Sequence, residues 1–339
     1  MSKPVASFDE IRAILREVPG PDLEAGKAAV ERQNQLTKPP GSLGRLEEVV
    51  AWLATWQGKH PPSLQRPRIA VFAGNHGVAE RGVSAFPPSV TAQMVANFVR
   101  GGAAVNQLSD FAGAELRVYE MALEKPTQDF TLGPALTEEE CAKAMAYGMM
   151  AVETGLDLMC LGEMGIANST SAAAVACALF GGKAKDWAGR GTGVDDEGLT
   201  RKIAVIEAGL AANPEARQDP FKAMQCLGGH ELAAITGAVL AARMARTPVM
   251  LDGFACTVAA AVLFKAEPAA LDHCLVSHRS VEPGHARLLD IVAKRPLFDF
   301  DMRLGEASGA ALAIPILKAA LACHTGMATF AQAGVSEKG

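Results

Sequence analysis

The residues of this sequence that could do chemistry gather in four segments, each of which follows a short apolar run. These segments span residues 73–91, 161–170, 189–202 and 277–309. Each combines glycines with polar or ionisable side chains, a composition typical of loops that face a ligand. They are therefore the candidates for a functional site.

Glu306 is the clearest candidate for a catalytic group. It follows Gly305, is surrounded by small residues and precedes a long apolar stretch. A carboxyl group in such surroundings loses water, which disfavours its charged form and raises its pKa toward the range of a general base. The same position also suits an ordinary glutamate at a helix start, stabilised by the helix dipole. The residues alone leave both interpretations open.

The segment 161–170 predicts a strand, a turn of small residues and then a helix that begins near Asn168, Ser169 and Thr170. Free N–H groups at a helix start, together with hydroxyl groups, can cradle a phosphate. Simple helix capping explains the same residues equally well. Glu163 would repel a phosphate, so its carboxylate is better suited to bind the hydroxyl groups of a ribose.

Two other segments are less specific. Residues 189–193 read GRGTG and precede Lys202, which can reach a phosphate as a point charge or lie on the surface. This is not a P-loop, because the motif GxxxxGK[ST] is absent. Asn75 and His76 stand between two glycines, as in a ligand-facing loop or a capped turn. His76 lacks neighbours at metal-ligand spacing.

The elements that must position these segments alternate between strands and helices. Helical patterns alone occupy the first 57 residues, and apolar runs with few charges then predict strands at 69–73, 116–121, 156–161, 249–251 and 274–276. Helices are expected at 89–110, 138–153, 170–180, 199–212, 231–244, 254–265, 283–294 and 307–323. This alternation predicts an open, mostly parallel α/β sheet, in which ligands bind outside the carboxyl ends of the strands.

Composition restricts the class of protein. Of the 339 residues 49% are hydrophobic and 20% charged, and the net charge of −5 comes without a basic run, which argues against nucleic acid and membrane as partners. The seven cysteines form no CxxC pair and are expected to be free thiols. No apolar run near the N-terminus resembles a secretion signal, and the longest runs are short or interrupted by Pro315 and Lys318. We expect a cytoplasmic protein.

Taken together, five segments resemble one family. They are LTKPPGSLGRL at 36–46, NHGV at 75–78, GEMGIANST at 162–170, LDGF at 251–254 and RLGEASGAALA at 303–313. They are similar to nicotinate-nucleotide–dimethylbenzimidazole phosphoribosyltransferases, in order, from about residue 36 to 328. The first and last segments are long and unusual in composition, which argues against a chance match.

The resemblance implies a Rossmann-like core with helices on both faces of the sheet, a smaller helical domain from the chain ends, and a homodimer. In this sequence the division is expected at 1–60, 61–300 and 301–339. The implied reaction moves ribose 5-phosphate from nicotinate mononucleotide to 5,6-dimethylbenzimidazole or a related base. It releases nicotinate, forms alpha-ribazole 5'-phosphate with inversion at the anomeric carbon, and belongs to cobalamin nucleotide-loop assembly. It requires no cofactor and no metal.

The resemblance also implies roles for individual residues. Glu306 is expected to be the catalytic base, with Glu163 and Lys202 beside it in the active site. The residues expected to bind the substrates are Asn75, His76, Phe86, Met94, Met164, Gly165, Asn168, Ser169, Thr170, Ser280, Arg303, Leu304 and Gly305.

Two departures from the family pattern stand out. Some members have Ser and Gln where this sequence has Phe86 and Met94, which leaves the preferred base open between dimethylbenzimidazole, other benzimidazoles, adenine and phenolic compounds. Ala307 replaces a common Gly, and we expect little effect because Ala suits a helix start.

Three alternative functions remain at this point. Water could replace the base, which would make the protein a nicotinate mononucleotide hydrolase. The chain could also be a nucleotide-binding regulator, although binding alone needs no desolvated carboxylate. A dehydrogenase is disfavoured because the glycine fingerprint of dinucleotide-binding folds is absent.

Overall fold

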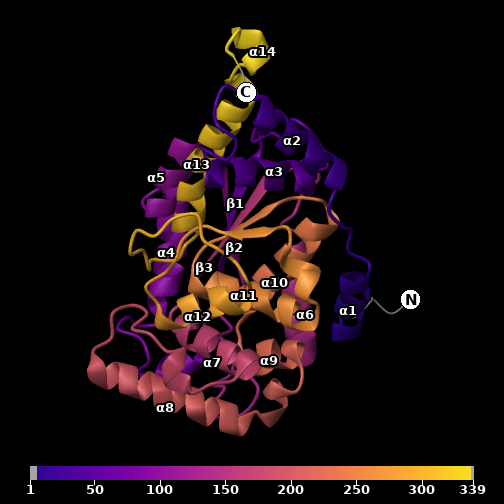
Figure 1. The fold of residues 1–339 in the computed structure, drawn as a ribbon. Helices are drawn as coiled ribbons and strands as arrows, with labels where there is room; N and C mark the ends of the chain where they lie inside the picture. The colour runs from indigo at the N-terminus through magenta and orange to yellow at the C-terminus, as the bar shows by residue number, and fades with distance from the viewer. Residues whose placement is uncertain (1–5, 337–339) are drawn as a thin grey trace.

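A computed structural model describes residues 6–336 of the chain. Its centre is a five-stranded parallel sheet with the order β2-β1-β3-β4-β5. The strands are β1 (Pro67–Ala73), β2 (Glu115–Glu120), β3 (Leu158–Met164), β4 (Val249–Leu251) and β5 (Cys274–Val276). All five lie where the apolar runs predicted them, and the α/β fold class is confirmed (Figure 1).

The helices cover both faces of this sheet, as Figure 1 shows. In chain order they are α1 (Phe8–Arg16), α2 (Leu23–Gln35), α3 (Arg45–Gln57), α4 (Ser89–Val99), α5 (Ala104–Ala112), α6 (Glu138–Met149), α7 (Asn168–Phe180), α8 (Asp196–Ala212), α9 (Pro220–Leu227), α10 (His230–Met244), α11 (Phe254–Ala266), α12 (Pro283–Ile291), α13 (Ser308–Gly326) and α14 (Phe330–Ala333).

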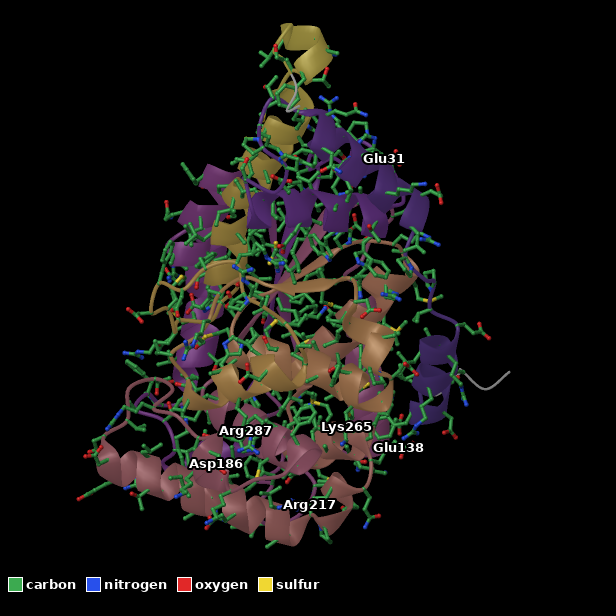
Figure 2. The ribbon with its side chains drawn as sticks, viewed as in Figure 1. Glu31, Glu138, Asp186, Arg217, Lys265 and Arg287 are labelled. Carbon is green, nitrogen blue, oxygen red and sulfur yellow. The ribbon has the colours of Figure 1, made fainter. Side chains whose placement is uncertain are left out.

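Two large hydrophobic cores form in the described part of the chain, one on each face of the sheet. Ala70 and Phe72 of β1 point into a core shared with α6, α7, α10 and α11. Ile69 and Val71 point the other way, into a core shared with α3, α4, α5 and α13. Successive side chains of a strand alternate between faces, so a strand buried on both faces must be apolar throughout. Charged side chains such as Glu31, Glu138 and Arg217 lie on the outside (Figure 2).

The strand order places a ligand crevice at a defined point. β1 pairs with β2 on one side and with β3 on the other, so the chain reverses its direction of winding there. In open α/β sheets such a switch point leaves a crevice outside the carboxyl ends of the two central strands. The loops that follow β1 and β3 carry the segments 73–91 and 161–170, and both are therefore brought to this crevice.

Some boundaries differ from the sequence prediction. The helix expected at 89–110 is two helices, α4 and α5, because Gly101 with φ +78° and Gly102 end the first one. The short helix α9 was not predicted, although Asp219 caps it and Pro220 opens it. β3 continues to Met164, so Glu163 lies at the end of the strand instead of in a loop.

The first helices of the chain pack in two different places. α2 and α13 lie side by side near the C-terminus, where Arg32 Nε donates to the carbonyl of His324 at 2.7 Å (Figure 1). α1 packs elsewhere, with Phe8 against Phe221. The division into domains stays a prediction, and the first residues, which bear on secretion, lie outside the described part.

α13 is long and apolar enough to cross a membrane by length and composition alone. Its apolar side chains, among them Ala310, Ile314 and Leu317, belong instead to the core on the α3 and α5 side of the sheet.

Candidate active site

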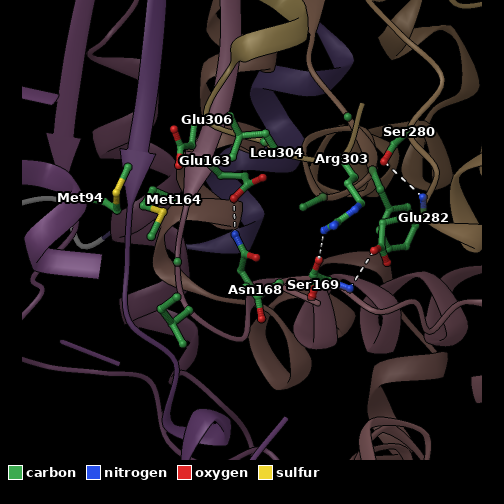
Figure 3. A pocket seen from close by; sticks show the side chains of 18 of the residues that line it. Met94, Glu163, Met164, Asn168, Ser169, Ser280, Glu282, Arg303, Leu304 and Glu306 are labelled. Atoms are coloured by element: carbon green, nitrogen blue, oxygen red, sulfur yellow. Dashed lines mark hydrogen bonds between the residues drawn. The ribbon is translucent and has the colours of Figure 1, made fainter. Parts of the chain in front are cut away.

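A cavity of about 740 Å³ lies at the carboxyl ends of the strands. Twelve of the residues singled out from the sequence line it: Phe86, Met94, Glu163, Met164, Gly165, Asn168, Ser169, Ser280, Arg303, Leu304, Gly305 and Glu306. They come from segments far apart in sequence, which the parallel sheet brings to one edge. Figure 3 shows Met94 and Met164 at one end, Ser280 and Arg303 at the other, and the two glutamates between them.

One end of the cavity is apolar. Phe86, Val90 and Met94 come from the loop after β1 and from α4, and Met164 and Ile166 come from the end of β3 and the turn after it. Phe86 is 52% exposed, although a large aromatic ring is usually buried. A flat apolar molecule would cover this surface, so this end suits an aromatic ring.

Two carboxyl groups occupy the middle of the cavity. The backbone N–H of Glu306 donates to the carbonyl of Glu163 at 3.1 Å, which joins the start of α13 to β3. Burial raises the pKa of Glu306 to about 7. Burial also raises the pKa of Glu163 well above its usual range, and the charges of Asp252 and Glu231 raise it further. The side-chain amide of Asn168 donates to the Glu163 carboxylate and acts in the opposite direction.

A close backbone contact fixes the position of Glu306. A Cβ on Gly162 would lie 2.1 Å from the backbone nitrogen of Ala307, so only glycine permits this approach. Gly305, Glu306 and Ala307 have φ values of +81°, +59° and +58°. Three consecutive left-handed residues turn the chain sharply into α13, at a cost for the two that carry a Cβ.

This conformation corrects the expectation for Ala307. Ala favours right-handed helical backbone, but Ala307 is the N-cap of α13 in the left-handed region and makes no side-chain cap. Helix propensity is therefore the wrong argument at this position, and a Gly there would be unstrained.

The other end of the cavity is polar. The side chain of Arg303 donates to the carbonyl of Gly191 at 3.1 Å, and the N–H of Gly191 donates to Glu282 at 2.8 Å. Ser169 at the start of α7 and Ser280 after β5 also line this end. Hydroxyl groups, a guanidinium group and a helix start together favour an anion, and the Glu282 carboxylate at the same end acts against it.

Lys202 lies behind this wall and does not line the cavity. It is 1% exposed, and its Nζ donates to the hydroxyl of Ser169 at 3.0 Å. Burial lowers the pKa of Lys202 to about 8, while the charge of Glu282 acts in the opposite direction. The charge of Lys202 acts on the cavity through Ser169 and past Gly191. A Cβ on Gly191 would lie 3.0 Å from Lys202 Nζ, so the absence of a side chain there leaves room for the ammonium group.

Three more of the residues expected to bind substrate lie behind the wall. His76 is buried between Glu231, at 2.6 Å from Nε2, and Ser171, at 2.9 Å from Nδ1. Asn75 is buried and its amide donates to the carbonyl of Leu123, and Thr170 is fully buried. The Ser–His–Glu chain has the composition of a hydrolytic triad, but all three side chains are sealed from solvent and serve to join α7, α10 and the loop after β1.

The cavity also contains residues that the sequence did not single out as binding groups. They include Thr192, Phe254, His278 and Glu282. Glu282 follows Ser280 by two residues, and an acidic residue after the last strand was the signal available for it. Among residues 6–336, no group of three or more His, Cys, Asp or Glu side chains is arranged to hold a metal ion.

Comparisons with known proteins identify the family of this chain. A family model described as phosphoribosyltransferase matches residues 18–335. Nicotinate-nucleotide–dimethylbenzimidazole phosphoribosyltransferases from Brucella canis and Sinorhizobium medicae are each 56% identical, over 99% and 100% of both chains. The crystal structure of the corresponding enzyme from Thermus thermophilus has a TM-score of 0.86 and 40% identity, and covers 93% of this chain and 99% of its own.

This chain belongs to the nicotinate-nucleotide–dimethylbenzimidazole phosphoribosyltransferase family. The resemblance seen in its five segments is thereby confirmed. In this phosphoribosyltransferase the two glutamates stand between an apolar end and a polar end of one cavity.

The Gly162–Ala307 contact generates a paired prediction for this phosphoribosyltransferase. Gly162→Ala forces the start of α13 away from β3 and should lower the free energy of unfolding by about 1–3 kcal/mol, the usual cost of overpacking. Ala307→Gly relieves left-handed strain and should leave that free energy unchanged or raise it by up to about 1 kcal/mol. Urea denaturation of both variants measures the two effects. Tolerance of Gly162→Ala, together with a large loss in Ala307→Gly, would contradict the contact.

Proposed function

We propose that this chain transfers ribose 5-phosphate from nicotinate mononucleotide to 5,6-dimethylbenzimidazole or a related base. The products are nicotinate and alpha-ribazole 5'-phosphate, the nucleotide used in cobalamin nucleotide-loop assembly. The names of the family members support this reaction. The observation that carries it is the order of groups along the cavity: an apolar end, two glutamates with raised pKa values, and an anion-binding end.

The polar end is assigned to the 5'-phosphate. Ser169, Ser280 and Arg303 offer donors there, and the buried charge of Lys202 lies behind Ser169. A phosphate held at this end is a remote handle that fixes the ribose between the two glutamates. The apolar end, with Phe86 and Met94, then receives the aromatic base. Since these side chains offer no strong hydrogen bond, contact with the ring faces and edges dominates base selection.

The chemistry requires one general base. Nicotinate is attached through a pyridinium nitrogen, so the bond electrons return to that nitrogen when the bond to C1' breaks, and no acid is needed. One benzimidazole nitrogen forms the new bond to C1', and the N–H of the other nitrogen gives its proton to Glu306. A carboxylate with a pKa of about 7 is well matched to accept that proton near neutral pH.

Glu163 is assigned to the ribose. The transition state gains positive charge at the anomeric carbon, and a carboxyl group beside it stabilises that charge when ionised. When protonated, Glu163 instead binds the ribose hydroxyl groups. A single displacement inverts the anomeric carbon, giving an α-riboside from a β-nucleotide.

Further parts of the proposal concern the state of the protein. We propose a cytoplasmic homodimer with small-molecule substrates only, without nucleic acid or membrane as partners. The net charge of −5, without a basic run, supports the exclusion of nucleic acid and membrane as partners. Sedimentation equilibrium of the full chain measures the oligomeric state.

The test of the reaction is product analysis. The purified protein is incubated with nicotinate mononucleotide alone and with a panel of bases, and the products are identified by mass. We expect nicotinate and the base ribotide to appear together and only when base is present. Release of ribose 5-phosphate without base would support hydrolysis and contradict the transfer.

Glu306→Gln should lower kcat by about 10²–10⁴-fold, the usual scale for a general base, while nicotinate mononucleotide still binds. In the parent protein the rate should rise with pH and reach half its maximum near pH 7, because only the ionised carboxylate accepts a proton. Steady-state rates across the neutral pH range measure both effects. Glu31→Gln, an exposed change on α2, is the control and should leave the profile unchanged. A Glu306→Gln variant with near-normal kcat would remove Glu306 from this role.

Lys202→Met keeps most of the side-chain volume but removes the charge behind Ser169. Loss of the charge-assisted hydrogen bond from Lys202 to Ser169, which orients that hydroxyl toward the phosphate, is worth about 1.5–3 kcal/mol, so the KM for nicotinate mononucleotide should rise at least about tenfold with a smaller change in kcat. Lys143→Met on the surface of α6 is the matched control. An effect confined to the KM of the base would contradict the phosphate assignment.

A further inference from the structure

The start of α13 lacks a local cap. Ala307 occupies the N-cap position and has no side-chain oxygen, although the first N–H groups of any helix need acceptors from outside it. Ser308 and Ala311 donate to the carbonyls of Gly305 and Ala307. The N–H of Ala310 has no such local partner, and donates at 3.0 Å to the carboxylate of Asp252, which lies 58 residues away in sequence.

Asp252 reaches this helix from the sheet. It directly follows β4, and its own N–H donates to the carbonyl of Leu161 on β3 at 3.2 Å. It is 1% exposed, and a Cβ on Gly309 would lie 2.1 Å from His278 Nδ1 and 2.9 Å from Asp252 Oδ1, so the second residue of α13 must lack a side chain for the ring and the carboxylate to fit beside it. One carboxylate thus ties β4 to the first turn of α13.

Asp252 has no charged partner in the described part of the chain. His278 is its nearest basic neighbour, with Nδ1 3.8 Å from Oδ1, but burial lowers the pKa of His278 to about 4 and leaves it neutral. Burial raises the pKa of Asp252 itself to about 7, against the effect of the N–H groups of Ala310 and Gly309. A buried carboxylate without a cation is costly, so its position calls for a reason.

We propose that Asp252 is a positioning residue for Glu306. Its carboxylate replaces the missing N-cap of α13 and so holds the left-handed pair Glu306–Ala307 against Gly162, with the Glu306 carboxyl group in the cavity. Without this acceptor the first turn of α13 frays, and Glu306 loses its fixed direction. The inference rests on the proposed role of Glu306 as general base.

The two carboxyl groups also act on each other through their charges. Glu306 and Asp252 are like charges in a buried site, and the charge of Glu306 raises the pKa of Asp252. Because the repulsion between two like charges acts on both partners, an ionised Asp252 opposes the ionisation of Glu306 in turn. The other titratable side chains around the pair are Glu163 and Cys160 on β3, Glu231 on α10, Cys256 on α11 and His278 after β5. Removal of the Asp252 charge should therefore move the acid limb of the pH profile to lower pH.

Two substitutions separate the role of Asp252 as a hydrogen-bond acceptor from the role of its negative charge. Asp252→Ala removes both, and kcat should fall about 10²-fold, the effect of misplacing a catalytic group by about 1 Å, with the KM for nicotinate mononucleotide within about threefold. Asp252→Asn keeps an oxygen for the N–H of Ala310, and kcat should recover to within about tenfold of the parent. Its acid limb should move below that of the parent protein, which a merely structural role would not produce.

Asp157→Ala is the matched control. Asp157 is another buried carboxylate beside the sheet, and it accepts the N–H groups of Gln65 and Arg66 at 2.8 and 2.9 Å at the amino end of β3, away from the cavity. It should lower the melting temperature as Asp252→Ala does but leave kcat within about threefold. All rates are measured below the melting transition, which circular dichroism establishes for each variant.

The outcomes separate the positioning role from the general-base role. A kcat in Asp252→Ala within about threefold of the parent, or an equal loss in Asp157→Ala, would overturn the positioning role. An unshifted acid limb in Asp252→Asn would overturn the coupling of the two carboxyl groups. If Glu306→Gln retains activity, the general-base assignment fails first; if it is inactive while Asp252→Ala is normal, only the positioning role fails.

Discussion

The first turn of α13 lies directly on β3, and the contact between Gly162 and Ala307 allows it. A side chain at 162 would collide with the backbone of Ala307, so the two elements meet only because one residue has no Cβ. The N–H of Glu306 then reaches the carbonyl of Glu163 at 3.1 Å. Two carboxyl groups from distant parts of the sequence thereby share one cavity, and the rest of the site is arranged around them.

The electrostatics of the site follow from this crowding. Asp252 and Glu306 are buried, Glu163 is partly buried beside them, and loss of water raises the pKa of each. Neutral hydrogen-bond donors partly offset these raised pKa values. The amide of Asn168 donates to Glu163, and the N–H of Ala310 in the first turn of α13 donates to Asp252. The carboxyl groups with raised pKa values therefore lie where the general base must accept a proton. The positive groups, Lys202 and Arg303, lie at the phosphate end.

Much of this arrangement could be predicted from the sequence. Buried parallel strands are short apolar runs, so all five were recognisable, and the rule that ligands bind at their carboxyl ends correctly brought Glu163 and Ser280 to the cavity. Local signals could not tell a residue in the wall from one behind it. His76 and Lys202 come from the expected segments, yet they point into the protein toward Glu231 and Ser169.

Contacts between residues that are distant in sequence could not be predicted either. Asp252 belongs to the LDGF segment, but nothing near it in sequence shows that its carboxylate caps a helix 58 residues later. Glu282 was missed for the same reason, because its partner Gly191 lies 91 residues before it. The left-handed backbone at Ala307 was hidden because Ala is the best helix former, and only the crossing of α13 over β3 imposes that conformation.

The most direct measurement is a crystal structure of Glu306→Gln, kept inactive, with both nicotinate mononucleotide and dimethylbenzimidazole bound. We expect the side chain at 306 to lie within hydrogen-bond distance of the base nitrogen that does not attack, with the phosphate against Ser169 and Arg303. A side chain at 306 that points to bulk water, away from both base nitrogens, would contradict the role of Glu306 as the general base.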